Sequence, residues 1–308
     1  MSFSRGFFSF YLGFAVLIQR SIGRVFSGGK KNINIKAKLI PLFFARKYLP
    51  LIENLQEKKI STETPEIMWQ FWDNPTGKIT PEIVKSSIKS VENFKGNFEH
   101  KILNNSTIAN YSDLPGFVFD RLKNKKIAYA HFADLLRLNL LKNHGGIWMD
   151  ATCFMTNFIP EQIKKQDFFV FLTGELTNYP YSFMQNCFIR AKKGSFLCEA
   201  WYQMCLEYWK KEKRRIDYFQ HQLMFKTLVE KNPTAKKLFA EMPHISEDET
   251  QQFVGKKLFA KFDENEWERI KKASFYQKTY YKEKRNTIAN PADYPNTFFS
   301  KLCEMDEK

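Results

Sequence analysis

The stretch AYAHFADLLRLNLLKNHGGIWMDATCF, residues 128–154, decides the fold that this sequence predicts. A helix is expected over residues 127–143, because its apolar residues follow helical spacing and neither Pro nor Gly interrupts them. Gly145 and Gly146 then end the helix, since glycine readily adopts the backbone found at helix C-termini. The apolar run that follows predicts a buried strand with Asp150 at its carboxyl end, where open α/β sheets bind their ligands.

Asp134 and Arg137 stand three residues apart on the predicted helix and therefore share one face. One interpretation is an exposed ion pair on the flank of the helix, which is common at this spacing. The other is a polar site, because both side chains interrupt an apolar surface shortly before Asp150. Charged residues are rarely buried without partners, so three of them around one glycine turn favour the polar site.

Two motifs in this stretch carry a resemblance to a known family. Ala-x-x-Ala-Asp-Leu-Leu-Arg, residues 130–137, followed by Gly-Gly-Ile-Trp-Met-Asp, residues 145–150, resembles the donor-site signature of glycosyltransferases with the GT-A fold. The pattern is most similar to the capsular polysaccharide synthesis group, which is related to transferases with a "DXD sugar-binding" region. The separation of 16 residues between Asp134 and Asp150 is also similar to that in the glucosylating clostridial toxins. The resemblance covers residues 65–282.

The resemblance implies an α/β chain with the GT-A, Rossmann-like, nucleotide-diphospho-sugar transferase fold over residues 61–308. The catalytic residues that it implies are Asp134, Arg137, Asp150 and Asn186. The donor-binding residues that it implies are Gln70, Trp72, Asp134, Arg137, Gly146 and Lys278.

For several of these residues, the resemblance also implies which part of the donor they would contact. Trp72, near the end of a predicted strand, would stack on the base with Gln70 beside it, although a Trp buried in the core is an equal alternative. The Gln-Asn pair ending at Asn186 would face the sugar, or it would bond the backbone as an edge-strand amide. Lys278 or Lys282 would fold back over the diphosphate.

The metal-binding motif of the resembled family is altered in this chain. The family at large has Asp-x-Asp at the strand end, whereas this chain has Asp150-Ala151-Thr152. The resemblance therefore implies a Mn²⁺ or Mg²⁺ ion at Asp150, with Thr152 in place of the usual second acid. A threonine hydroxyl is a poorer ligand for such hard cations than a carboxylate, so metal dependence is left open.

The activity that the resemblance implies is transfer of a hexose from a nucleotide-sugar donor. The donor that we expect first is a UDP-hexose. The acceptor would be a growing capsular or other cell-surface polysaccharide, or a lipid-linked oligosaccharide, and the anomeric configuration would be retained. The alternative is a non-catalytic, membrane-peripheral assembly protein on a degenerate GT-A fold. The missing second acid motivates this alternative, because a fold does not by itself establish an activity.

The amino-terminal segment, residues 1–60, is predicted to be a basic, apolar, helical extension that associates with membranes. The chain has a formal net charge of +15, and residues 1–50 hold nine basic and no acidic residues. Two apolar runs, residues 7–18 and 39–44, lie among these charges, which is typical of an interfacial anchor on an anionic leaflet. We therefore expect a peripheral or monotopic protein on the cytoplasmic face of the membrane. The alternative is a core helix with a solvated basic flank.

Other classes of function find less support in the sequence. The basic charge lies beside apolar segments and no nucleic-acid-binding module is recognisable, so no nucleic-acid partner is expected. Five cysteines without a Cys-x-x-Cys pair indicate neither a disulfide framework nor a zinc site.

Elsewhere in the chain, apolar runs alternate with helical patterns, which favours a parallel sheet with flanking helices. Asp217 and His221 are predicted to share one face of a helix, either as an acceptor-side pair or as an ordinary helix pair.

Overall fold

The centre of the molecule is a five-stranded sheet with strand order β2-β1-β3-β6-β5. The computed structural model describes residues 29–58, 66–74, 79–177, 179–253, 257–282 and 287–305, without the side chains of residues 29–36. The strands of the sheet are β1 (Ile67–Phe71), β2 (Glu99–Leu103), β3 (Gly146–Met149), β5 (Phe168–Leu172) and β6 (Met184–Ala191). The α/β class predicted from the sequence is thus confirmed.

The sheet is mixed rather than parallel, which corrects the sequence prediction. β1 is parallel to both β2 and β3, but β6 is antiparallel to β3 and to β5. The connection between β5 and β6 contains only a short 3-10 turn, Pro180–Ser182, in its described part. Neighbouring parallel strands need a long crossover, whereas antiparallel neighbours do not, so this connection lets β6 return beside β5.

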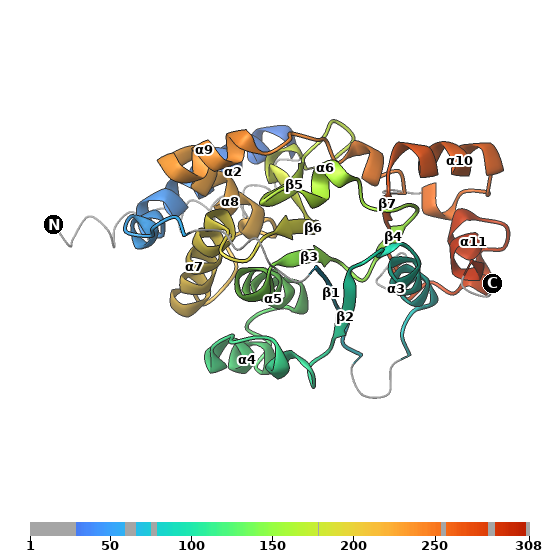
Figure 1. The fold of residues 1–308 in the computed structure, drawn as a ribbon, viewed down its shortest axis with the longest axis horizontal. Coiled ribbons are helices and arrows are strands. Elements are labelled where there is room, and N and C mark those ends of the chain that lie inside the picture. The colour runs from blue at the N-terminus through green and yellow to red at the C-terminus, as the bar shows by residue number, and fades with distance from the viewer. Residues whose placement is uncertain are drawn as a thin grey trace.

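Helices flank the sheet on both sides (Figure 1). They are α2 (Gly29–Lys47), α3 (Glu82–Phe94), α4 (Gly116–Lys123), α5 (Tyr129–His144), α6 (Glu161–Lys164), α7 (Phe196–Lys211), α8 (Gln220–Lys231), α9 (Pro233–Glu241), α10 (Glu264–Ala273) and α11 (Phe298–Glu304). In Figure 1, α2, α7, α8 and α9 gather on the left. α3, α10 and α11 lie on the right, beside a two-stranded antiparallel ribbon of β4 (Cys153–Met155) and β7 (Tyr276–Lys278).

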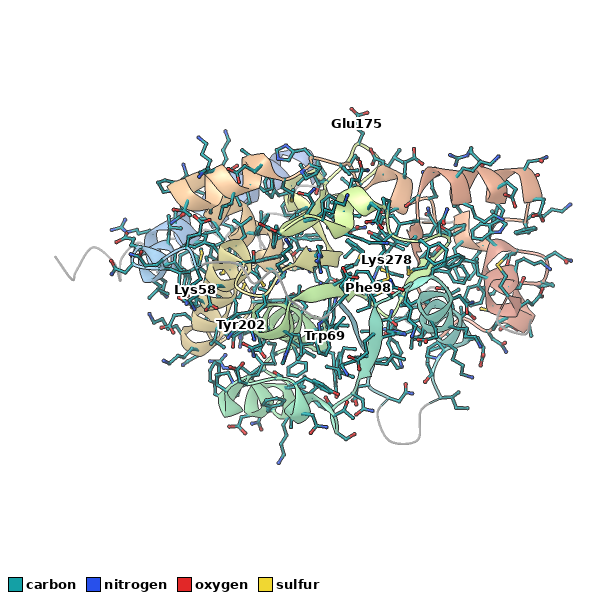
Figure 2. All side chains as sticks on the ribbon, in the orientation of Figure 1. Lys58, Trp69, Phe98, Glu175, Tyr202 and Lys278 are labelled. Atoms are coloured by element: carbon teal, nitrogen blue, oxygen red, sulfur yellow. The ribbon has the colours of Figure 1, made fainter. Side chains whose placement is uncertain are left out.

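The predicted helix and strand of the central stretch form as α5 and β3. The Gly145 N–H donates to the Leu141 carbonyl at 2.8 Å, and its φ of 72° turns the chain out of the helix. Gly146 follows with a φ of 104° and lies against β1, where an added Cβ would stand 2.3 Å from the Ile67 carbonyl oxygen. Because only glycine fits there, the turn sets how closely β3 approaches β1. In Figure 2, Trp69 of β1 lies well inside the molecule.

Helix α2 belongs to the main hydrophobic core. Ile40, Phe43 and Phe44 are buried, and α2 packs on α8. The Tyr48 hydroxyl donates to Glu212 Oε1 at 2.7 Å and so ties the end of α2 to α7. Residues 39–44 therefore lie in a core helix, which was the alternative to a membrane anchor, and the predicted boundary at residue 60 does not separate them from the domain.

The other apolar run of the amino-terminal segment, residues 7–18, lies outside the described residues. Within the part of the chain that the structure does describe, no helix is both long and apolar enough to cross a bilayer. Membrane association of residues 1–28 thus stays a prediction.

We predict that Gly146→Ala lowers the free energy of unfolding by about 2 kcal/mol or more, since it adds a steric overlap to an unfavourable φ. Urea denaturation of the purified variant measures this. Gly116→Ala is the matched control, because a Cβ at the first residue of α4 meets nothing within 4 Å. Equal stability of the two variants would contradict the role given to Gly146.

Candidate functional site

A cavity of about 590 Å³ opens where β1 and β3 end and β6 begins. Its lining includes the end of β1, the start of α5, the turn after β3 and Asn186 of β6. Small-molecule sites have volumes of about 300–1,000 Å³, and in α/β sheets they lie at the carboxyl ends of strands. The predicted residues Trp72, Asp134, Arg137 and Asp150 all line this cavity.

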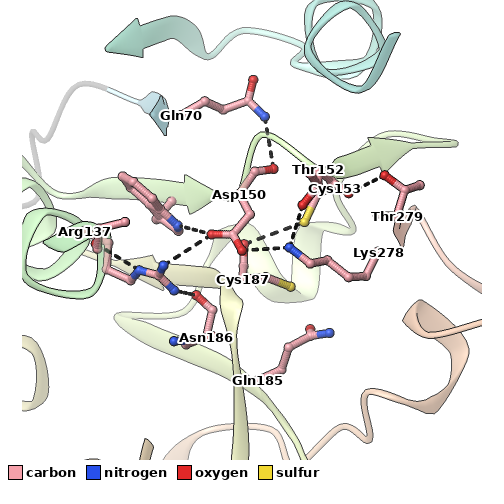
Figure 3. Close-up of polar contacts among 12 residues, drawn as sticks. Gln70, Arg137, Asp150, Thr152, Cys153, Gln185, Asn186, Cys187, Lys278 and Thr279 are labelled. Atoms are coloured by element: carbon pink, nitrogen blue, oxygen red, sulfur yellow. Dashed lines mark hydrogen bonds and ion pairs between the residues drawn. The ribbon is translucent and has the colours of Figure 1, made fainter. Parts of the chain in front are cut away.

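Asp150 is held by three side chains (Figure 3). Trp148 Nε1 donates to Oδ1 at 2.9 Å, and Lys278 Nζ donates to Oδ2 at 2.7 Å. Arg137 Nη2 lies 3.4 Å from Oδ1. Burial raises the pKa of the carboxyl, but the charges of Lys278 and Arg137 outweigh it and the pKa is lowered. Asp150 is therefore an anion at neutral pH.

Asp134 lies deeper than Asp150 and is almost enclosed. Asn186 Nδ2 donates to its Oδ1 at 2.9 Å, His131 Nδ1 lies 3.2 Å from its Oδ2, and Arg137 Nη2 lies 3.4 Å from its Oδ1. Burial raises the pKa, yet His221, Arg137 and His131 together bring it down to about 2. Since Asp134 is only 7% exposed and Arg137 only 4%, they form no solvated pair on a helix flank.

Arg137 joins the two carboxylates. One nitrogen, Nη2, lies 3.4 Å from both Asp134 Oδ1 and Asp150 Oδ1. Nη1 donates to the Asn186 carbonyl, Nε donates to Ala133 at 3.2 Å, and the guanidinium stacks on Trp148 at 5.1 Å. A planar fork of fixed donors is needed to reach all these groups at once, and lysine lacks it.

His131 and His221 belong to this cluster, and sequence reasoning did not place them there. The signal for His131 was its position three residues before Asp134, a spacing that puts these two side chains on one helical face. The predicted partner of His221 was Asp217, but α8 begins after Asp217, whose Oδ1 instead accepts from the Phe219 N–H at 2.9 Å.

His221 lies against Trp201, with ring centroids 4.1 Å apart, and its Nδ1 stands 3.8 Å from Asp134 Oδ1. Burial lowers the pKa of its imidazole to about 3 despite the nearby Asp134. The ring is therefore neutral at pH 7. Arg137 consequently supplies the fixed positive charge beside Asp134.

Trp72 and Gln70 differ in how they relate to the cavity. Trp72 is half-buried in the cavity wall, in edge contact with Tyr281 at 5.2 Å, and its stacking on a base stays a prediction. Gln70 is fully buried and does not line the cavity. Its Nε2 donates to the Asp150 carbonyl at 3.3 Å, and its Oε1 lies 2.8 Å from His100 Nε2. Gln70 thus supports the main chain of Asp150, and its predicted contact with a donor is not tested by this geometry.

Gly146 and Gln185 also lie away from the cavity. Gly146 packs against β1 and is not among the residues that line the cavity, and its contact with a donor stays a prediction. Gln185 points away, where its Nε2 donates to Thr250 Oγ1 at 3.3 Å and its Oε1 accepts from the Tyr276 hydroxyl. Asn186, its neighbour on β6, faces the cavity and contacts Asp134. Alternation of side chains along the strand accounts for the difference.

The contacts of Asp150 do not fit a divalent cation. Lys278 Nζ donates to both Asp150 Oδ2 and Thr152 Oγ1 at 2.7 Å, and Trp148 Nε1 donates to Asp150 Oδ1 at 2.9 Å, so each side-chain oxygen that the altered motif could offer to a metal already accepts a hydrogen bond. Among the described residues, no group of three or more His, Cys, Asp or Glu side chains is arranged to hold a metal ion. The sequence prediction of Mn²⁺ or Mg²⁺ at Asp150 stays a prediction, and such an ion would compete with Lys278 for these oxygens.

Comparison with known proteins gives a family match over most of the chain. Residues 26–302 match the family described as capsular polysaccharide synthesis protein. No curated protein shows a significant match to the sequence. Among solved structures, the PaToxG glycosyltransferase is similar with a TM-score of 0.41 and 14% sequence identity, over 67% of this chain and 84% of that chain.

We predict that His221 makes the protein less stable in mild acid. Between pH 6.5 and 3 the unfolded chain binds a proton at this histidine that the native state does not, so the free energy of unfolding falls as the pH falls. From pH 7 to 5 the wild type should lose about 2 kcal/mol more than His221→Gln.

Urea denaturation at both pH values measures this difference. The exposed His244 provides the control variant His244→Gln, which should behave as the wild type does. Equal losses in the wild type and in His221→Gln would contradict the prediction.

Proposed function

We propose that this chain, which belongs to the family of capsular polysaccharide synthesis proteins, is a glycosyltransferase that uses a nucleotide-sugar donor. The observation that carries the proposal is the pair of carboxylates, the buried Asp134 and the partly exposed Asp150, bridged by Arg137 in the lining of a cavity. The mixed α/β sheet with this site at its strand ends supports the GT-A assignment. The size of the cavity suits a ligand of this class.

The lining of the cavity supports one orientation of the donor. Trp72 offers an aromatic face for the base at one wall. Asp134 and Asn186 lie at the floor, where their side chains meet, and carboxylate and amide groups suit sugar hydroxyls. Lys282 lines the wall as well, and Lys278 is held between two lining residues, so both lysines lie within reach of the diphosphate.

The reaction that we propose breaks the bond between the sugar carbon and the diphosphate oxygen. The electron pair leaves with the nucleoside diphosphate, while an acceptor hydroxyl oxygen bonds to the sugar carbon and releases its proton to solvent or to the departing diphosphate. Cationic side chains fixed near the phosphates favour this departure, because they stabilise the charge that develops there. Arg137 keeps Asp134 and Asp150 in place throughout.

The finer parts of the proposal follow the family resemblance. The donor is a UDP-hexose, the configuration at the sugar carbon is retained, and the acceptor is a capsular or other surface glycan, free or lipid-linked. A thermal-shift screen of UDP-, GDP- and other nucleotide sugars tests the donor, since a ligand that binds the native state raises the melting temperature. Release of nucleoside diphosphate from the best donor then tests turnover.

We predict that Asp150→Asn lowers turnover at least 100-fold, about 2.7 kcal/mol in the transition state. The amide keeps an acceptor for Trp148 but loses the negative charge opposite Arg137 and Lys278. Steady-state kinetics on the folded variant measure the loss. Asp113→Asn is the control, because it replaces an exposed carboxylate outside the cavity, and it should leave turnover unchanged. Turnover above one third of wild type would remove Asp150 from the catalytic site.

We also propose that residues 1–28 bring the protein to the cytoplasmic face of the membrane. They hold the apolar run 7–18 and three arginines, Arg5, Arg20 and Arg24, without an acidic residue. Apolar side chains among cations suit an anionic membrane surface.

Deletion of residues 1–28 should therefore abolish sedimentation with phosphatidylglycerol vesicles while donor binding persists. The deletion stops before α2, because that helix is part of the core. Phosphatidylcholine vesicles serve as the control for charge. Full sedimentation of the truncated protein would contradict this proposal.

A further inference from the structure

The Lys278 ammonium occupies the position opposite the altered Asp-Ala-Thr motif. Its Nζ donates to Asp150 Oδ2 and to Thr152 Oγ1, each at 2.7 Å. A divalent cation held by this motif would compete for these two oxygens or for Asp150 Oδ1, which accepts from Trp148 Nε1, because hard cations bind oxygen ligands directly. Figure 3 shows Lys278 pointing at both residues from the side opposite Arg137.

The fold fixes the backbone that carries Lys278. β7 pairs with β4, and Lys278 stands opposite Cys153, next to the motif. The Thr279 N–H and the Thr279 hydroxyl both donate to the Thr152 carbonyl at 2.8 Å. This double contact fastens the end of β7 to the turn after β3. The backbone of Lys278 is therefore held in place by the hydrogen bonds of the next residue, Thr279.

The charges at the cavity floor balance without a metal ion. Asp134 and Asp150 supply two negative charges, and Arg137 and Lys278 supply two positive charges within 3.4 Å of them. A divalent cation at Asp150 would add two charges beside an ammonium that already uses the carboxylate. Like charges at such a distance repel strongly where solvent is limited.

The Lys278 side chain is partly exposed beside the cavity. It is 24% exposed, and although Lys278 itself does not line the cavity, its two partners Asp150 and Thr152 both do. A lysine ammonium has three N–H donors, and the two bonds to the motif use two of them. The third has no hydrogen-bond acceptor among the described residues and suits a phosphate oxygen.

We propose that the Lys278 ammonium replaces the divalent cation, so that the donor's diphosphate binds this lysine directly and without Mn²⁺ or Mg²⁺. The inference rests on the proposed glycosyltransferase function and specifies how its site receives the donor. When the bond between sugar and diphosphate breaks, the electron pair stays on the diphosphate, and Lys278 stabilises the added charge.

Calorimetric titration of UDP and of GDP, each in EDTA and in Mn²⁺, tests the proposal. Wild-type affinity for the nucleotide that binds should agree within threefold between the two conditions. Lys278→Met should weaken that affinity at least tenfold in EDTA. Lys164→Met, a lysine of α6 that pairs with Glu161 away from the cavity, is the matched control and should bind as wild type does. Affinity of the wild type that falls tenfold in EDTA and returns with Mn²⁺ would overturn the proposal.

Electron paramagnetic resonance of Mn²⁺ alone separates this proposal from the proposed function. The free-ion signal should be unchanged by wild-type protein, because Lys278 occupies the motif. Loss of the signal with wild type but not with Asp150→Asn would show a metal site at Asp150 and overturn the proposal. Were neither nucleotide to bind in any condition, the glycosyltransferase function would lose support, and the Mn²⁺ signal would still decide whether Asp150 holds a metal.

Discussion

One buried arginine connects the parts of this protein that form the site. Arg137 projects from α5, contacts Asp134 on the same helix and Asp150 after β3, and donates to the main chain of β6 at Asn186. Removal of one partner of a buried ion pair costs several kcal/mol in other proteins. Here it would take the guanidinium from the buried Asp134, whereas Asp150 would keep Lys278. The relative positions of helix, strand end and neighbouring strand at the cavity therefore depend on this guanidinium.

Around Arg137, the site is a closed set of compensated charges. Each carboxylate has a cationic partner, and each also accepts a hydrogen bond from a neutral group, Trp148 for Asp150 and Asn186 for Asp134. Groups held in this way do not need to reorganise when a ligand arrives, which is the condition for effective electrostatic stabilisation. The neutral His221 fits this balance, because a second cation beside Asp134 would upset it.

The basic amino-terminal segment divides into two parts with different surroundings. Helix α2 buries its apolar residues against α8 and bonds through Tyr48 to α7, so it contributes to the same core as the sheet. An apolar run beside Lys and Arg is compatible with lipid or with protein as its partner, and hydropathy alone does not separate the two. Residues 39–44 lie in a core helix because α2 packs against other helices of the domain.

The sequence by itself determined the local features of this protein. The spacing of apolar residues predicted α5, the glycines predicted its end, and Asp150 followed from the short strand after them. The tertiary structure decided the mixed sheet, the burial of α2, and the contacts of Gln70 and Gly146. It also paired Asp150 with Lys278, a residue 128 positions away. The periodicity of apolar residues and the conformations of glycine depend on a few neighbouring residues, so they can be read from the sequence alone. Strand order and ion pairs depend on which distant segments of the chain fold together.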